Sequence, residues 1–107
     1  MEEPARIVLL ITTADAGEAH QIARALLEQR LAACANIIPG VSSHFWWQGK
    51  IDSAAESLLI LKTTTTRLKE VVIAIRQLHS ETVPEIIALP IIGGNPDYLG
   101  WIDKEVK

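Results

Sequence analysis

Two long extended segments, separated by a turn of only three residues, limit the fold of this chain more than any other feature. The first lies within ACANIIPGVSSHFWWQ, whose last residue begins the turn of Gln48, Gly49 and Lys50, and the second runs from Ile51 to Thr63. Each predicted strand has about 13 residues, which corresponds to about 43 Å at ~3.3 Å per residue. A compact domain of 107 residues is only about 34 Å across. The hairpin is therefore predicted to project beyond its own domain.

Three aromatic side chains lie near the tip of this hairpin. Phe45 and Trp47 fall on one face of the strand and Trp46 on the other, because side chains alternate along a strand. A projecting arm that exposes these residues to water is prone to aggregation. We therefore predict that another copy of the chain covers Phe45, Trp46 and Trp47. Two alternatives are a local core around the tryptophans and a ligand stacked on them.

The first part of the chain predicts a strand, a helix and the start of the hairpin. The apolar run from Arg6 to Thr12 is typical of a strand buried on both faces. Asp15 and Glu18 have the spacing of a capping box, so a helix is expected over residues 16–30. The dipeptide Pro39-Gly40 predicts a bulge or bend near the start of the hairpin.

A second helix follows the hairpin. Its apolar stripe runs from Leu68 to His79, and the preceding TTTTR segment is expected to supply a threonine N-cap. Pro84 separates this helix from a predicted strand over residues 85–92. Asn95 and Pro96 then mark the start of a short terminal helix. The order β-α-β-β-α-β plus a helix predicts the ferredoxin-like split βαβ, an antiparallel sheet with helices on one face.

Composition narrows the class of protein. A length of 107 residues predicts a single domain over residues 1–107. With 49% hydrophobic and 21% charged residues, this domain can build a core and is not disordered. Its net charge of −3 argues against a nucleic-acid partner, and no apolar run reaches the ~18 residues of a membrane span. The acidic start, MEEPAR, is unlike a secretory signal, and the single cysteine excludes an internal disulfide. We therefore expect a cytoplasmic protein.

Several segments carry a resemblance to a known family. RLAACANIIPGVSSHFWWQGKI, LLILKTTTTR, VPEIIALPI and DYLGWI occur in this order, and together they resemble the CutA divalent-cation-tolerance family. The resemblance implies a ferredoxin-like homotrimer whose long hairpins pair between subunits, an architecture similar to that of the PII signalling proteins. It also implies a role in tolerance to divalent cations, with binding of copper(II), and no obligatory cofactor.

Candidate metal ligands are scattered along the chain. No H-x-x-x-H or C-x-x-C spacing is present, so the sequence gives no specific metal signature. His79 is the strongest candidate, because Glu81 and Glu85 follow it across a loop that Pro84 stiffens. His79 can instead pack or cap the carbonyl groups of its own helix, because a histidine near the last turn is favoured there. The other candidate donors are Cys34, His20 and His44.

The chain departs from the resembled family at two positions of the copper site proposed for it. The family has a cysteine at the end of the first strand, where this chain has Ile11, and an aromatic residue in the loop position of Glu81. These departures predict weaker metal binding or a different metal preference. Cys34 is only a partial replacement, because a cysteine that starts an interior strand is expected to be buried and inert.

A second group of candidates comprises Glu56, Lys62, Glu85, Tyr98 and Trp101. Lys62 ends the apolar run LLILK, where a lysine is rarely buried unless it is paired, and Glu85 opens a strand expected to lie near it. One interpretation is an ion pair that holds the sheet or the subunit interface together. The other is a small-ligand pocket in a cleft between subunits, with Lys62 as the charged group and Trp101 as a wall.

The sequence offers no constellation typical of an enzyme. The TTTT hydroxyls have no partner base, and GGNPD lacks the pattern of a phosphate-binding loop. Three classes of function therefore remain. The protein is a copper-binding trimer involved in metal response, a PII-like regulatory module for a small molecule, or a trimeric scaffold for a partner protein.

Overall fold

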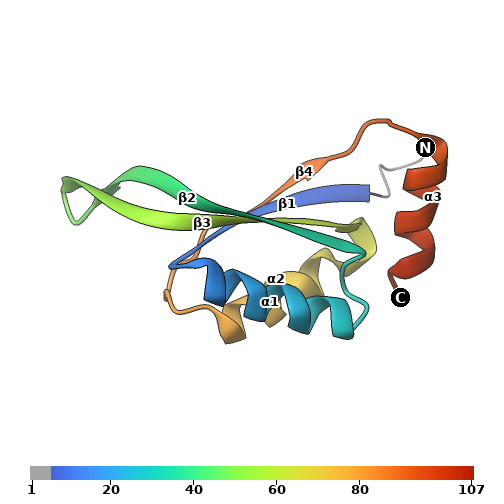
Figure 1. The fold of residues 1–107 in the computed structure, drawn as a ribbon, viewed down its shortest axis with the longest axis horizontal. Helices are drawn as coiled ribbons and strands as arrows, with labels where there is room; N and C mark the ends of the chain where they lie inside the picture. The colour runs from blue at the N-terminus through green and yellow to red at the C-terminus, as the bar shows by residue number, and fades with distance from the viewer. Residues whose placement is uncertain (1–5) are drawn as a thin grey trace.

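A four-stranded antiparallel sheet with helices on one face forms the centre of the computed structural model, which describes residues 6–107 (Figure 1). The strands lie in the order β2-β3-β1-β4. The elements are β1 (Arg6–Thr13), α1 (Ala16–Glu28), β2 (Cys34–Trp47), β3 (Lys50–Thr64), the 3₁₀ turn η1 (Thr65–Arg67), α2 (Leu68–Leu78), β4 (Ile86–Pro90) and α3 (Pro96–Glu105). This arrangement confirms the predicted α+β class and element order.

Local hydrogen bonds explain where α1 begins and ends. Asp15 caps the helix, since its Oδ1 accepts the Glu18 N–H at 2.8 Å, and Glu18 Oε1 in turn accepts the Ala14 N–H at 2.8 Å. The helix ends at Glu28, two residues earlier than predicted, because Arg30 takes a left-handed conformation with φ of 60°. This residue lies in the loop that closes the helix terminus.

The predicted threonine cap of the second helix is wrong. A 3₁₀ turn intervenes before α2, and neither Thr64 nor Arg67 makes a side-chain capping bond. The Thr64 hydroxyl instead lies 3.0 Å from that of Thr66, so it is engaged outside the helix. The predicted cap of α3 is confirmed, because Asn95 Oδ1 accepts the Asp97 N–H at 3.0 Å.

The hairpin contains a tight turn and a bulge. Gln48 and Gly49 alone form the turn, with φ values of 51° and 80°, so Lys50 belongs to β3 and the predicted turn is one residue too long. Such left-handed pairs match the twist of the strands they join. The predicted bulge is confirmed at Pro39-Gly40, where the β2–β3 register shifts and Gly40 has φ of 74°.

The prediction that the hairpin projects is also confirmed. Its distal half extends well beyond the helices, and the chain measures 43 × 28 × 23 Å along its principal axes (Figure 1). In the single chain Phe45, Trp46 and Trp47 are 38%, 73% and 50% exposed. A local core around the two tryptophans is therefore not formed within one chain.

The prediction that β1 is buried on both faces is wrong for the single chain. Ile7, Leu9 and Ile11 point towards the helices and are buried, whereas Val8 and Leu10 point away and are only half-buried. The reason is that α1 and α2 both cover the same side of the sheet (Figure 1). The main core lies on that side, between the sheet and these two helices.

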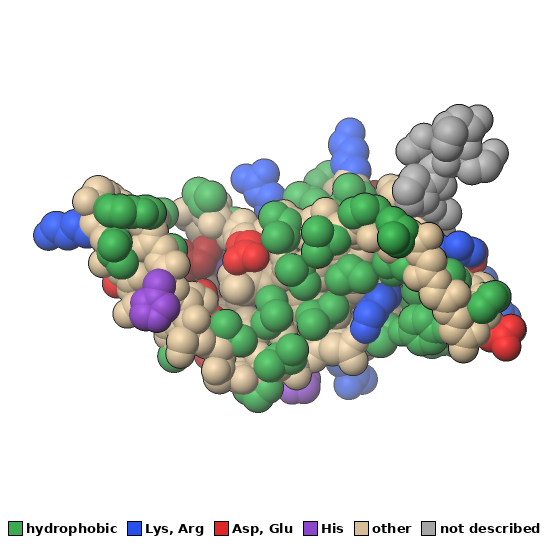
Figure 2. All heavy atoms as spheres, turned by 90° about the horizontal axis from the view of Figure 1, so that it is seen from above, with side chains coloured by type: hydrophobic (Ala, Val, Ile, Leu, Met, Phe, Trp, Pro, Cys, Tyr) green, Lys and Arg blue, Asp and Glu red, His purple; other side chains and the backbone are tan. Residues whose placement is uncertain are grey.

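The other side of the sheet, which we call the open face, is largely apolar. Figure 2 looks onto this face and shows hydrophobic side chains spread across it. Strand register and alternation assign Val8, Leu10, Ile38, Leu58, Ile60, Ile87 and Leu89 to it. Ile38, Ile87 and Leu89 are each close to half exposed. An apolar surface of this kind marks an interaction site.

Candidate functional site

A groove lies between the distal half of the hairpin and the loop that follows α2. It has a volume of about 790 Å³, and we call it the acidic groove. Among residues 6–107, four carboxylates and two imidazoles line it, and no lysine or arginine does. Acidic side chains are visible in Figure 2 where the hairpin leaves the sheet. The lining residues are Thr12, Ser42, Ser43, His44, Phe45, Trp47, Asp52, Ala54, Glu56, His79, Glu81, Val83, Pro84 and Glu85.

The groove brings together the whole predicted metal group and part of the predicted ligand pocket. It contains all three predicted metal ligands, His79, Glu81 and Glu85, together with Glu56 from the predicted ligand pocket. Asp52 was not predicted as a site residue. Its cross-strand partner is Phe45, a pairing that depends on the register after the bulge. If the turn is taken as Gln48 and Gly49 alone, strand pairing counted outward from it places Asp52 opposite Phe45. The sequence therefore contains the signal that could have found Asp52.

His79 connects three segments at the edge of the groove. Its Nδ1 accepts the Glu81 N–H at 3.0 Å, so the proton must be on Nε2, which donates to the Thr12 carbonyl at 2.7 Å. The imidazole ring therefore ties α2 to β1 and does not cap its own helix. Both ring nitrogens have partners in this arrangement, and one of them must be released before His79 can bind a metal.

Glu18 fixes the start of the same loop. Its Oε2 accepts the Ser80 N–H at 2.6 Å, while its Oε1 accepts the Ala14 N–H. Partial burial by itself would raise the pKa of the Glu18 carboxyl, but the bonds from Ala14 and Ser80, with His79 nearby, outweigh it and lower that pKa. The capping box reveals Glu18 in the sequence, but its bond to Ser80 is a tertiary contact that no local pattern predicts.

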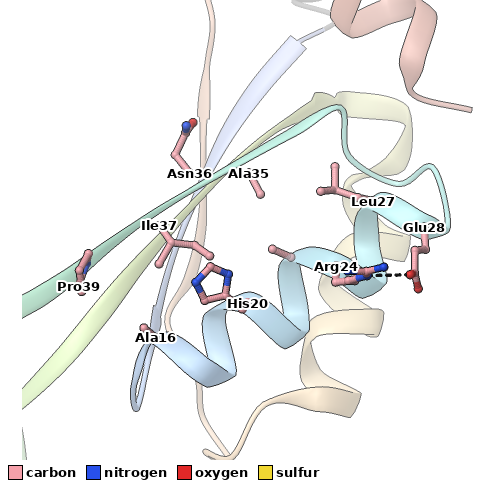
Figure 3. A pocket seen from close by; sticks show the side chains of 10 residues that line it. Ala16, His20, Arg24, Leu27, Glu28, Ala35, Asn36, Ile37 and Pro39 are labelled. Atoms are coloured by element: carbon pink, nitrogen blue, oxygen red, sulfur yellow. Dashed lines mark hydrogen bonds and ion pairs between the residues drawn. The ribbon is translucent and has the colours of Figure 1, made fainter.

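The groove does not form a closed metal site within one chain. Among residues 6–107, no group of three or more His, Cys, Asp or Glu side chains is arranged to hold a metal ion. His44 lines the groove, whereas His20 lies elsewhere, in a hollow between α1 and β2 beside the Arg24–Glu28 ion pair (Figure 3). Ile11 is fully buried in the core and offers no donor atom. Metal ligation by His79, Glu81 and Glu85 thus stays a prediction.

The predicted pairing of Lys62 with Glu85 is not present within the chain. Lys62 lies opposite Val8 of β1, whereas Glu85 lies near the other end of β1, where Thr12 Oγ1 is 3.4 Å from Glu85 Oε1. The reason is the antiparallel direction of β4, which pairs Ile86 with Ile11. The first residue of β4 is therefore placed far from Lys62.

Lys62 belongs instead to a second cluster beside α3, which we call the Lys62 patch: Cys34, Asn36, Lys62, Tyr98 and Trp101. Lys62 Nζ donates to Asn36 Oδ1, and the Cys34 thiol lies 3.7 Å from the same oxygen. The Tyr98 and Trp101 rings lie 5.4 Å apart at 33°. Burial, followed by contact with the Cys34 thiol, raises the pKa of Tyr98. Cys34 is half-buried and not buried as predicted, because it points to the open face.

Known proteins resemble this chain over almost its whole length. The profile of the family described as CutA1 divalent ion tolerance protein matches residues 7–105. A divalent-cation tolerance protein CutA of Thermus thermophilus is 48% identical over 95 residues, which cover 89% of this chain and 92% of that protein. The chain belongs to the CutA1 family. Another CutA, from Archaeoglobus fulgidus, is 44% identical over 99 residues, covering 92% of this chain and 96% of that protein.

Solved CutA structures have the same fold. The Thermus thermophilus CutA1 structure matches with a TM-score of 0.94 and 45% identity, covering 95% of this chain and 99% of that one. The Archaeoglobus fulgidus structure, described as a periplasmic CutA, gives 0.92 and 43%, with the same coverage. A rice CutA1 relative is described as chloroplastic, so the cytoplasm remains a prediction for this CutA1 chain. No helix in the described part of the chain is long and apolar enough to cross a membrane.

Proposed function

We propose that the protein serves divalent-cation tolerance by binding copper(II), or a similar divalent cation, in the acidic groove. The observation that carries this proposal is the charge of the groove, because four carboxylates and two imidazoles line it without a lysine or arginine. Carboxylate oxygens and neutral imidazole nitrogens are suitable ligands for Cu(II) and Zn(II). Membership of the CutA1 family supports the same role.

The geometry of the groove favours weak and open binding. The residues of the described chain form no ready-made group of three donors, so a bound cation keeps water or takes a ligand from a neighbouring subunit. His79 must also give up a hydrogen bond, to Glu81 N–H or to the Thr12 carbonyl, before it binds. We expect an affinity for Cu(II) that is roughly micromolar or weaker, and tighter than for Zn(II) according to the usual order of divalent metals.

Calorimetry on matched histidine variants tests this function. His79→Ala should weaken Cu(II) binding, whereas His20→Ala should leave it unchanged, because His20 lies outside the groove. Imidazole binds a metal only when it is neutral, so the wild-type affinity should fall in acid. Equal Cu(II) affinity in wild type and His79→Ala would remove His79 as a ligand. Undetectable binding to the wild type would reject the proposed function.

We propose that the protein acts as a homotrimer. The apolar open face and the projecting aromatic hairpin support self-association, and the resemblance to CutA proteins supplies the number three. A second candidate function is binding of a small molecule at a subunit cleft. The adjacent Tyr98 and Trp101 rings in the Lys62 patch favour it, since aromatic walls and one charged group suit a small organic anion. Equilibrium dialysis against nucleotides distinguishes this candidate from metal binding.

A further inference from the structure

The acidic groove and the Lys62 patch lie at opposite ends of the same open face. Lys62 is beside Val8, and Glu85 contacts Thr12, so they are four residues, or about 13 Å, apart along β1. They also lie on opposite sides of β1, because β3 and β4 flank it. Two inter-strand spacings add about 10 Å across the sheet. A lysine side chain of ~6 Å length cannot bridge this separation.

Each end carries charge that the described residues of its own chain do not balance. The ion pairs found over residues 6–107 are Arg6–Asp103, Arg24–Glu28, Arg30–Glu105 and Arg67–Glu70, and none includes Lys62 or a groove carboxylate. Lys62 Nζ bonds only the neutral side chain of Asn36 there, while Lys62 itself is half-buried in a largely apolar face. A half-buried ammonium group gains considerably from a carboxylate partner.

We propose that Lys62 of one copy enters the acidic groove of a neighbouring copy and pairs there with Glu85. The ammonium group then occupies the place that a divalent cation would take, so assembly and cation binding compete for the same carboxylates. This competition rests on the proposed function, whereas the pairing between copies does not. The occupant is a second copy because the patch and the groove have opposite charge and both have aromatic walls, Tyr98 and Trp101 in one and Phe45 and Trp47 in the other.

The shape of the chain is consistent with this contact. An interface that joins one end of a molecule to the other end of its neighbour is head-to-tail, and it closes into a ring when the rotation permits. The groove runs along the distal half of the hairpin, and this half projects beyond the helices (Figure 1), so a neighbour seated at the groove would lie alongside the arm. The same contact would cover apolar residues of the open face between the two ends, such as Leu10, Ile60 and Ile87.

Charge reversal tests the pairing. Lys62→Glu and Glu85→Lys each place like charges together and should weaken self-association at least about tenfold, as measured by light scattering across a concentration series. The double variant restores opposite charges and should recover the wild-type mass. Lys69→Glu, an exposed change on α2, should have no effect. A monomeric wild type, unchanged single variants or a double variant that stays dissociated would each overturn the pairing.

Milder variants keep the test decisive if a reversed charge prevents folding. Lys62→Met and Glu85→Gln should each lower the melting temperature, and the double variant should melt higher than the sum of the two losses predicts. Strictly additive losses would show that the two side chains do not interact.

Calorimetry tests the competition separately. Without the ammonium group, Lys62→Met should bind Cu(II) at least about fivefold more tightly than wild type, whereas Lys69→Met should match wild type. Equal affinity of wild type and Lys62→Met would overturn the competition. The light-scattering measurements would then decide the pairing between copies by themselves. If neither wild type nor Lys62→Met binds Cu(II), the proposed function fails and the competition with it, but a restored double variant still establishes the pairing.

Discussion

At the scale of single residues, Glu18 has the most structural consequence for the candidate site. One carboxylate accepts backbone N–H groups from Ala14, just before α1, and from Ser80, in the loop beside the groove. Because His79 and Glu81 flank Ser80, the position of this loop depends on a residue of another helix. Glu18 therefore helps to position the acidic groove although it does not line it.

We predict that Glu18→Gln destabilises the protein in a pH-dependent way. The pKa of Glu18 is lowered in the folded state, so its contribution is present above the unfolded pKa of about 4.3 and is lost as pH falls through the folded value. At neutral pH the loss should be about 1 kcal/mol, since the bonds are charge-assisted but the group is partly exposed. Urea titrations at pH 7 and pH 3 measure it. A loss of equal size at both pH values would contradict the prediction.

At the scale of elements, backbone conformation decides how the hairpin is built. Gly40 and Gly49 have φ of 74° and 80°, in the left-handed region that disfavours a side chain. Neither glycine has an atom within 4 Å of an added Cβ, so replacing it costs backbone energy and causes no clash. The bulge and the turn therefore depend on glycine for conformation alone.

Alanine substitutions at these glycines test this dependence. Gly40→Ala and Gly49→Ala should each destabilise the protein by about 1 kcal/mol. Gly93→Ala is the matched control, because an added Cβ also meets no neighbour there and φ lies outside the left-handed region. It should be neutral or slightly stabilising. Thermal unfolding of the three variants decides it, and a Gly93→Ala loss as large as the other two would argue against a conformational cause.

The sequence predicts those elements whose hydrogen bonds are local. The caps by Asp15 and Asn95 and the bulge at Pro39-Gly40 depend on residues within a few positions, and the structure confirms them. The threonine cap fails because the Thr64 hydroxyl binds another hydroxyl.

The candidate site is predicted only in part for a similar reason. His79, Glu81 and Glu85 are neighbours in one loop, so the sequence already groups them. The distance between Lys62 and Glu85 depends on the strand order and on the direction of β4, which no local pattern contains. The place of Glu56 in the acidic groove likewise depends on strand pairing, since Glu56 lies opposite Val41 of β2.

At the scale of the whole molecule, the continuous apolar run of β1 and the half-covered sheet have one explanation. A run of this kind is typical of a strand covered on both sides. The described part of one chain places α1 and α2 on one side only, which leaves Val8 and Leu10 half-buried. Self-association would cover the other side, so the failed prediction for the single chain is itself an argument for assembly.

We predict a homotrimer in which Trp47 is buried between subunits. Light scattering at micromolar concentration should give about three times the 11.7 kDa mass of the chain. Trp47 and Ile73 are both 50% exposed in the single chain, which makes Ile73→Ala a matched control. Trp47→Ala should weaken assembly and cost about 3–5 kcal/mol, the usual loss for truncating a buried tryptophan. Ile73→Ala, on the outer surface of α2, should keep the trimer mass. A monomer with a cooperative melt, or equal effects of the two substitutions, would show that the open face and the hairpin are exposed in solution.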